Sequence, residues 1–396
     1  MTRRRMHAAL AGTVLAIGLV VNVQPGIAHK PITSPYTYND DVFPILRDRC
    51  GSCHVSGGVA PMSLMTHADA VPWGESIRTE VLAGHMPPAT VDEAPARFRN
   101  PPGLTPREMN LLLTWVTGGT PIGSPDKDPK PMAREAAWPL GPPDVTLPLP
   151  TEAVVGTDER ERTIEFIVPT GITERRWVRA ADLQPGTAAM VRAATIAVRS
   201  PGAAGTTAER MLALWLPGED PIALDAGLGF ELPSSAEMVV RVLYRKTWEY
   251  ERRELKDRST VGLYFAPASS TSVQALRLAP EFTAVAAPDR FAFRRVLNED
   301  SRAVAIYPEA GLNNASVKVV ATRPDKTRVD LIAFHPRPDW TRRYWFREPI
   351  ALPRGTTVEV TVTFDDESSL SPLSLSPAAA TRPDLSSMRL TLNVVQ

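Results

Sequence analysis

Proline is the feature of this sequence that most restricts its fold. The chain holds 39 prolines among 396 residues, about twice the average frequency of roughly 5%. Because proline lacks a backbone N–H and clashes with the preceding helical turn, long helices and coiled coils are disfavoured. The sequence therefore favours short strands, short helices and loops. Its length of 396 residues predicts two or three domains.

The charge balance excludes one class of partner. Lys and Arg together number 44, as do Asp and Glu. A nucleic-acid-binding protein needs a surplus of basic residues to neutralise phosphates. We therefore expect no nucleic acid as a partner.

Residues 1–28 have the pattern of a secretory signal. Arg3, Arg4 and Arg5 precede an apolar run from Ala8 to Val23, and small residues lead to Ala28. The run is shorter than the ~20 residues that span a bilayer, so we expect cleavage rather than anchoring. Removing three of the 44 basic residues leaves 41 against 44 acidic ones, a charge of −3. No later segment is apolar enough to span, and we expect a periplasmic or secreted protein.

The first part of the mature chain has helical periodicity. We expect a helix before Cys50, with Asn39 or Asp40 as its N-cap, and a second helix over residues 66–83. Thr105-Pro106-Arg107-Glu108 is a capping box that starts a third helix, which Gly118-Gly119 ends. These elements predict a small all-α domain over residues 34–125, and the Pro-rich residues 126–143 predict a linker.

From Asp144 onward the apolar residues alternate, as is typical of β-strands. We expect two all-β, jelly-roll-like sandwiches over residues 144–268 and 280–396, with the border between 266 and 280. The clearest strand segments are 163–168, 194–198, 238–244, 261–265, 302–307, 317–322, 329–334 and 357–364.

The two cysteines form a motif with a defined chemistry. Cys50-Gly51-Ser52-Cys53-His54 is C-x-x-C-H, the attachment sequence of haem c. Two thiols three residues apart reach the two vinyl groups of one porphyrin, and the adjacent imidazole becomes the proximal iron ligand. A zinc site would need two further ligands, and a thioredoxin-like pair would need a βαβ surround. One covalent haem c, with His54 on its iron, is therefore the predicted cofactor.

The distal iron ligand is predicted from a second short segment. Met86 lies in Gly84-His85-Met86-Pro87-Pro88, and a methionine on a proline-stiffened loop suits an electron-transfer cytochrome. His85 and His67 are the alternative ligands, and Met86 as a core side chain is the structural alternative. We also consider that the Pro61 carbonyl orients the His54 ring.

The sequence also resembles a known family. The segments DVFPILRDRCGSCH, GGVAPMSL, VPWGESIRTEVLAGHMPPA and LTPREMNLLLTWVTGGTPIG resemble the small cytochrome c domain that precedes bacterial copper type II, ascorbate-dependent monooxygenase-like domains. The segments VPTGITERRWVRAADLQPG, LWLPGEDP, DRSTVGLYFA and LPRGTTVEVTVTFDD are similar to the monooxygenase-like partner, whose family includes the peptidylglycine and dopamine monooxygenases. The resemblance implies two jelly-roll sandwiches, each of which holds one copper ion in the family.

The family's copper ligands are missing here. By the resemblance, its ligand positions fall on Arg192-Ala193, Leu243, Glu309 and Gly311, and Met388 alone matches a ligand type. The six histidines leave one imidazole, His335, in residues 131–396, and cupric copper requires several. Asp365-Asp366-Glu367 is interpreted as a solvated turn. We therefore expect no copper and name no catalytic residue.

These patterns predict an exported monohaem c-type cytochrome that transfers single electrons to or from periplasmic redox proteins. Its copper-free β unit would be a docking or ligand-binding platform. An electron carrier is favoured over a catalyst. The alternatives are a haem-containing copper monooxygenase or other oxidoreductase, and a haem-based sensor or structural envelope module.

Overall fold

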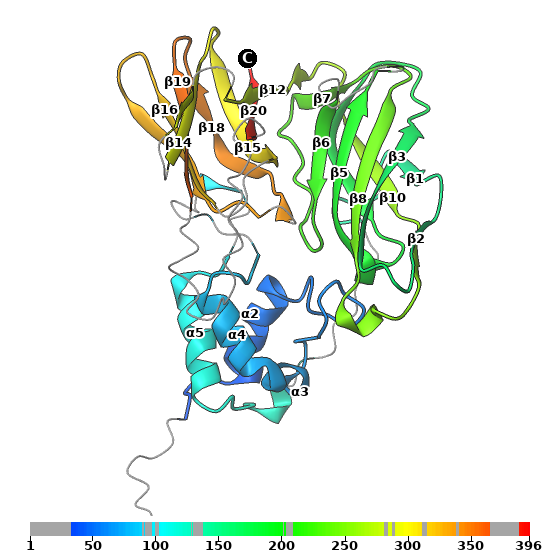
Figure 1. Cartoon of the computed structure of the whole chain (residues 1–396), viewed down its shortest axis with the longest axis vertical. Helices are drawn as coiled ribbons and strands as arrows, with labels where there is room; N and C mark the ends of the chain where they lie inside the picture. The colour runs from blue at the N-terminus through cyan, green and yellow to red at the C-terminus, as the bar shows by residue number, and fades with distance from the viewer. Residues whose placement is uncertain are drawn as a thin grey trace, which may run out of the picture.

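The computed structural model has a helical region next to two β-sandwiches (Figure 1). It describes residues 33–88, 91, 97–99, 103–127, 129, 138–200, 202, 209–280, 284–286, 290–310, 315–337, 340–364 and 388–396. The expected signal segment, residues 1–28, lies outside these ranges. The structure is thus mostly β with a few short helices, as the sequence predicts.

The helical region comprises short helices separated by loops. Its elements are η1 (Tyr38–Val42), α2 (Phe43–Arg49), α3 (His67–Ala70), η2 (Val71–Trp73), α4 (Gly74–Leu82), α5 (Pro106–Thr117) and η4 (Pro125–Lys127). The predicted helix 66–83 is interrupted by the 3₁₀ turn η2 at the Val71-Pro72 step, because proline supplies no N–H. Asn39 and Asp40 are not N-caps but lie inside η1, a turn of π-helix capped at Thr37.

The first sandwich holds residues 145–272. One sheet has the order β1 (Val145–Pro148), β10 (Thr260–Ala266), β4 (Arg176–Gln184), β7 (Leu228–Leu232), β11 (Thr271–Ser272). The other has the order β3 (Glu161–Pro169), β8 (Glu237–Arg245), β5 (Val191–Arg199), β6 (Arg210–Trp215). A two-stranded sheet adds β2 (Ala153–Val155) and β9 (Leu255–Asp257). Apolar side chains from both larger sheets share one buried core.

The second sandwich is built from the rest of the chain. One sheet has the order β12 (Gln274–Leu278), β20 (Arg389–Val395), β15 (Ser301–Ala310), β18 (Tyr344–Leu352). The other has the order β13 (Ala284–Ala286), β14 (Arg290–Val296), β19 (Thr357–Phe364), β16 (Ala315–Thr322), β17 (Arg328–Phe334). The C-terminal strand β20 thus lies between two strands that precede it by about a hundred residues of sequence.

The chain passes between the sandwiches at Val273, within the expected border. The second sandwich begins earlier than residue 280, because β12 starts at Gln274 and pairs with β20. Arg343 connects the two bodies: its guanidinium donates to the carbonyls of Leu212 (2.8 Å) and Met211 (3.1 Å). The same group lies 4.8 Å from the ring centroid of Tyr307. The two sandwiches therefore form one packed β unit.

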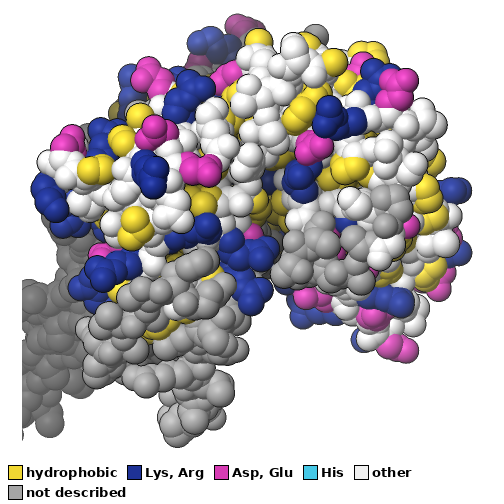
Figure 2. Space-filling model, turned by 90° about the horizontal axis from the view of Figure 1, so that it is seen from above, with side chains coloured by type: hydrophobic (Ala, Val, Ile, Leu, Met, Phe, Trp, Pro, Cys, Tyr) yellow, Lys and Arg dark blue, Asp and Glu magenta, His cyan; other side chains and the backbone are white. Residues whose placement is uncertain are grey.

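The surface of the β unit carries mixed charge. Figure 2 shows Lys and Arg side chains interspersed with Asp and Glu on the face that it displays. None of the helices in the described ranges is both long and apolar enough to cross a membrane.

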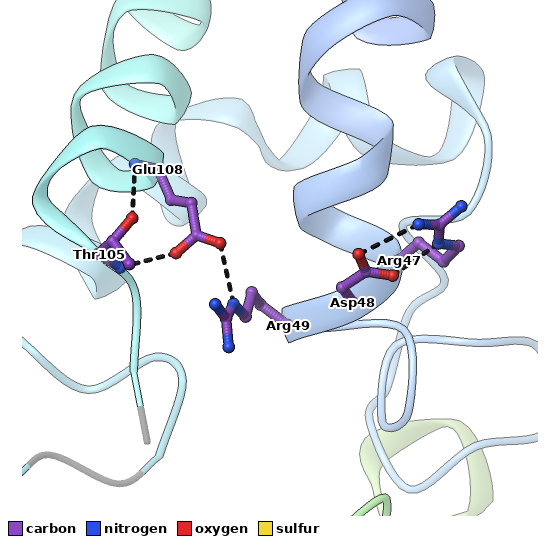
Figure 3. Close-up of polar contacts among 5 residues, drawn as sticks. All are labelled: Arg47, Asp48, Arg49, Thr105 and Glu108. Carbon is purple, nitrogen blue, oxygen red and sulfur yellow. Dashed lines mark hydrogen bonds and ion pairs between the residues drawn. The ribbon is translucent and has the colours of Figure 1, made fainter. Parts of the chain in front are cut away.

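The predicted capping box at the start of α5 is confirmed. Glu108 N donates to Thr105 Oγ1 (3.2 Å), and Thr105 N donates to the Glu108 carboxylate (2.7 Å). The same carboxylate accepts from Arg49 Nε at 3.0 Å (Figure 3). The bond joins the start of α5 to the last residue of α2, immediately before Cys50. The capping box thereby helps to fix where the attachment motif begins.

The helical region has its own small core. Tyr38, Trp115 and Leu112 are buried, and the Tyr38 hydroxyl donates to the Leu64 carbonyl at 2.8 Å. Residues 121–124 return to η1, where the N–H of Tyr38 donates to the Pro121 carbonyl at 2.9 Å. These contacts hold the helices around the loop that follows Cys50.

Residues 97–99 lie in the stretch predicted as helical domain but pack on the second sandwich instead. Phe98 forms a β-bridge with Phe346 of β18 and belongs to the core of that sandwich. Val91 likewise forms a bridge with Phe334 of β17. The end of the expected linker packs on the first sandwich. Trp138 lies beside Gly262, and the Gly141 carbonyl accepts a hydrogen bond from the Tyr264 hydroxyl.

Candidate cofactor-binding site

A cavity of about 680 Å³ lies where the helical region meets both sandwiches. Cys50, Cys53, His54 and Met86 all line it, although 36 positions separate the first of them from the last. Its apolar wall comes from the helical region: Leu46, Leu64, Ile77, Val81, Leu104 and Leu112. The structure thus brings the predicted attachment residues and the predicted distal ligand into one space.

The attachment motif forms a tight turn after α2. The N–H groups of Cys53 and His54 both donate to the Cys50 carbonyl, at 3.0 and 2.8 Å. The turn aims both thiols and the imidazole at the same cavity, and the two cysteines are not joined in a disulfide. Burial raises the pKa of the Cys50 thiol to about 12, so this cysteine is held as the neutral thiol.

His54 is oriented by a backbone contact. Its Nδ1 lies 3.2 Å from the Met62 carbonyl, which leaves Nε2 as the ring nitrogen available to a metal. The sequence-based expectation assigned this contact to Pro61, and the structure places it one residue later. The reason is the turn after Gly57-Gly58, where Leu64 N donates to the His54 carbonyl and brings Met62 beside the ring. Burial lowers the pKa of His54, and the Arg192 cation lowers it further.

Met86 lies on the loop after α4. The N–H groups of His85 and Met86 both donate to the Glu80 carbonyl, at 2.9 and 3.2 Å, which folds the loop back over the helix end. The Met86 side chain lines the cavity and is 39% exposed. It is therefore not a core side chain.

The two histidines considered as alternatives lie elsewhere. His85 is exposed, and its Nδ1 is 3.2 Å from a Glu80 carboxylate oxygen. His67 Nε2 is 2.8 Å from the Thr120 carbonyl, and its ring packs edge-on against Tyr38. Neither lines the cavity that holds Cys50 and Cys53. Among the three candidates, the geometry favours Met86.

The β unit closes the other side of the cavity, which sequence reasoning missed. Four guanidinium side chains and one indole line this wall: Arg192 and Arg245 of the first sandwich, and Arg337, Trp340 and Arg342 near β18. Arg342 forms an ion pair with Glu219 at 3.1 Å, and Arg245 forms one with Glu161. No local motif predicts these residues, because they are brought to the cavity by packing between domains.

The first sandwich also touches the attachment turn itself. Gly218, in the loop after β6, has φ = +74°, and a Cβ added there would lie 1.9 Å from Ser52 Cβ. Cys53 Sγ lies 3.6 Å from the Pro217 carbonyl. Only glycine allows this approach and this backbone conformation together. Ser52, one of the two residues between the cysteines, is thus in direct contact with the β unit.

The residues present fit a haem c group. The donor set is two thiols, one oriented imidazole and one thioether, which is the set that attaches and ligates a cytochrome c haem. The volume of about 680 Å³ falls in the range of roughly 300–1,000 Å³ found for ligand pockets. The apolar helical wall suits the faces of a porphyrin ring. The arginines of the β wall suit the carboxylates at the edge of that ring.

The positions that the family resemblance gives for copper were also located. Ala193 of β5 and Leu243 of β8 are register partners, so two of these positions do lie side by side. Glu309 pairs instead with Arg277 at 3.1 Å, and Met388 is buried in the core of the second sandwich. Within the residues that the structure describes, no group of three or more His, Cys, Asp or Glu side chains is arranged to hold a metal ion.

Of the remaining residues named from the sequence, His335 does not line this cavity. His335 is exposed. Gly311 and the carboxylates Asp365-Asp366-Glu367 lie outside the described residues, so their expected roles stay predictions.

No protein-family model matches the sequence, and no curated protein is similar to it. Solved structures that are similar in part include a protein described as an alpha-L-fucosidase of Bacteroides ovatus (10% identity, 54% of this chain, 34% of that chain, TM-score 0.19). They also include a fucolectin of striped bass serum (10%, 62%, 84%, TM-score 0.17). A third is the turret protein A223 of Sulfolobus turreted icosahedral virus (13%, 64%, 98%, TM-score 0.15). This chain spans about a third of the fucosidase's length, and TM-scores this low define no shared function.

Proposed function

We propose that this chain is an exported, monohaem c-type cytochrome that transfers single electrons. The observation that carries the proposal is the shared cavity, into which Cys50, Cys53, His54 and Met86 all project. The C-x-x-C-H sequence alone names a cofactor, and the cavity supplies a space and a second ligand for it. The family resemblance supports the same assignment.

Each residue then has a defined task. Cys50 and Cys53 hold the porphyrin by thioether bonds, and His54, oriented by the Met62 carbonyl, presents Nε2 to the iron. Met86 presents its sulfur from the opposite loop. When bound, the haem supplies a one-electron couple between ferrous and ferric iron. The apolar side chains of α2, α4 and α5 exclude water from the ring.

The β unit is proposed to be a copper-free relative of the monooxygenase-like core. The strand register supports this relation: Ala193 and Leu243, two positions that the resemblance gives for copper ligands in the first sandwich, are register partners. An alanine, a leucine and an arginine supply no neutral nitrogen donors for copper. Under this proposal the β unit serves as a docking or ligand-binding platform.

The decisive test is a set of spectra on the purified full chain. Haem that stays on the polypeptide after extraction with acid acetone supports covalent attachment, and free haem in the extract contradicts it. Met86→Ala should open the iron to carbon monoxide or cyanide, whereas the matched variant His85→Ala should leave the spectrum unchanged. A Met86→Ala spectrum identical to wild type would favour a sensor with an open or differently filled sixth position.

A metal analysis on the same sample tests the rival enzyme function. We expect no stoichiometric copper after dialysis against a mild chelator. We also expect no ascorbate-dependent oxygen consumption. About one equivalent of retained copper, together with oxygen consumption that stops on chelation, would restore the monooxygenase.

A further inference from the structure

The loop that carries Met86 is held by the second sandwich as well as by its own helix. Arg337 Nη1 donates to the His85 carbonyl at 3.1 Å, across 252 positions of sequence. The bond fixes the peptide immediately before Met86. The Arg337 side chain also lines the cavity, so it lies at the junction of the loop, the cavity and the β unit.

The chain that follows this loop is anchored more firmly still. Phe98 is 1% exposed and stacks on Phe346 with ring centroids 5.5 Å apart. Arg99 N donates to the Trp345 carbonyl at 2.9 Å, and the Arg99 guanidinium reaches Asp225 at 2.5 Å. The far end of the Met86 segment is therefore part of the β unit.

The opposite loop is held by the first sandwich. Gly218 lies against Ser52, and Pro217 lies against Cys53, at the contacts described above. The two sandwiches are in turn fixed to each other through Arg343. One packed body thus touches both the loop of the proximal histidine and the loop of the distal methionine.

We propose that the β unit is a clamp that sets the separation of His54 and Met86 and thereby keeps the thioether on the iron. The inference rests on the proposed haem function and adds a task for the β unit that the family resemblance does not assign. Arg337 and Gly218 are its positioning residues. A thioether is a weak, neutral ligand, so ligation depends on how well the loop is held in place.

The first test is Arg337→Gln in the full chain. Loss of the bond to the His85 carbonyl should weaken the methionine–iron charge-transfer band and raise carbon monoxide affinity about 2- to 10-fold, the value of one hydrogen bond. Haem content is quantified on the same samples, because Arg337 also lines the cavity. The matched control is Arg323→Gln, which removes a guanidinium bonded to the Ala351 carbonyl in the same sandwich. This control should match wild type.

The second test changes the contact between the first sandwich and the attachment turn. Gly218→Ala should press on Ser52 and also raise carbon monoxide affinity. Gly171→Ala is the control, because Gly171 has a similar φ of +68° but no atom within 4 Å of an added Cβ.

The outcomes separate the two proposals. If Arg337→Gln and Gly218→Ala both keep the wild-type band and affinity while haem is attached, the clamp is overturned and the cytochrome stands. If the wild-type chain carries no covalent haem, the proposed function itself is overturned.

Discussion

The helical region and the β unit differ in the size of their hydrophobic cores. Each sandwich fills the space between its sheets with side chains from both, as in the set that includes Val178, Ile196 and Val240. The helical region has only the small core around Tyr38 and Trp115 and borders a cavity of about 680 Å³. The stability of a region that has a small core and borders a cavity depends on the ligand that fills the cavity. The β unit should be stable by itself, and under the proposed function the helical region should depend on bound haem for its stability.

Removing the attachment thiols gives the largest expected effect on this contrast. Cys50→Ala or Cys53→Ala should lower haem yield and lower the melting temperature of the helical region, because a ligand that binds only the folded state stabilises it. The transition of the β unit should stay within experimental error of wild type. Calorimetry with haem quantification on the same samples checks this. Unchanged melting of the helical region in a haem-free variant would contradict the contrast.

Phe98→Ala tests where the border between the two regions lies. Phe98 precedes α5 in sequence but is buried in the core of the second sandwich, so its loss should destabilise that sandwich by roughly 3–5 kcal/mol. Phe293→Ala, in the same core, is the matched control and should act on the same transition. Urea unfolding followed by a probe in each region measures both. If Phe98→Ala destabilises only the helical region, Phe98 does not belong to the core of the second sandwich.

A buried carboxyl lowers the free energy of unfolding of the β unit at neutral pH. Asp182 is 4% exposed, and burial raises its pKa to about 6 from 3.8. The folded state therefore binds more protons between these values, so stability falls as pH rises through that window and is lowest above it. Asp182→Asn should stabilise the β unit by roughly 1–3 kcal/mol at neutral pH and by little near pH 4.

Urea unfolding at both pH values measures the Asp182 effect. Asp158→Asn is the control, because Asp158 is an exposed carboxyl in the same sandwich. An Asp182→Asn gain that is equal at both pH values would show that ionisation is not its cause.

The smallest expected effect belongs to the capping box. Thr105→Ala removes the acceptor of the Glu108 N–H and should destabilise the helical region by about 1 kcal/mol. Thr117→Ala, at the other end of α5, is the control, since its hydroxyl bonds only within the helix. We expect the difference to be measurable in haem-loaded protein, in which the helical region is folded. Equal effects of the two substitutions would argue against the cap.

The sequence predicted the elements that depend on local signals. The box at Thr105 and Glu108 is present as expected, and all eight of the clearest strand segments are strands. Hydrophobic period and capping chemistry act over a few residues, so they can be read from a single chain. Spacing and ligand type assigned Cys50, His54 and Met86 to one haem; the three residues do line one cavity, and the haem itself stays a prediction.

Other features depend on contacts between distant segments. Nothing near Phe98 indicates that its ring packs in the second sandwich beside Phe346, about 250 residues later in the sequence. Arg192 and Arg337 carry no local motif either. Their place on the cavity wall results from the packing of three bodies, for which a single sequence has no periodic signal. The Pro61 assignment failed for a smaller reason, since a one-residue difference in the turn brings Met62 to the ring.

The central position of β20 has a consequence for the order of assembly. The sheet that carries β18 is complete only when the last residues, 389–395, have entered between β12 and β15. Domains fold as the chain is synthesised, beginning at the N-terminus. The helices and the turn at Cys50–His54 can therefore form while the pocket for Phe98 does not yet exist. In that interval the cavity lacks the part of its β wall that carries Arg337, Trp340 and Arg342. Under the proposed function, a porphyrin would be joined to the thiols before that side closes over it.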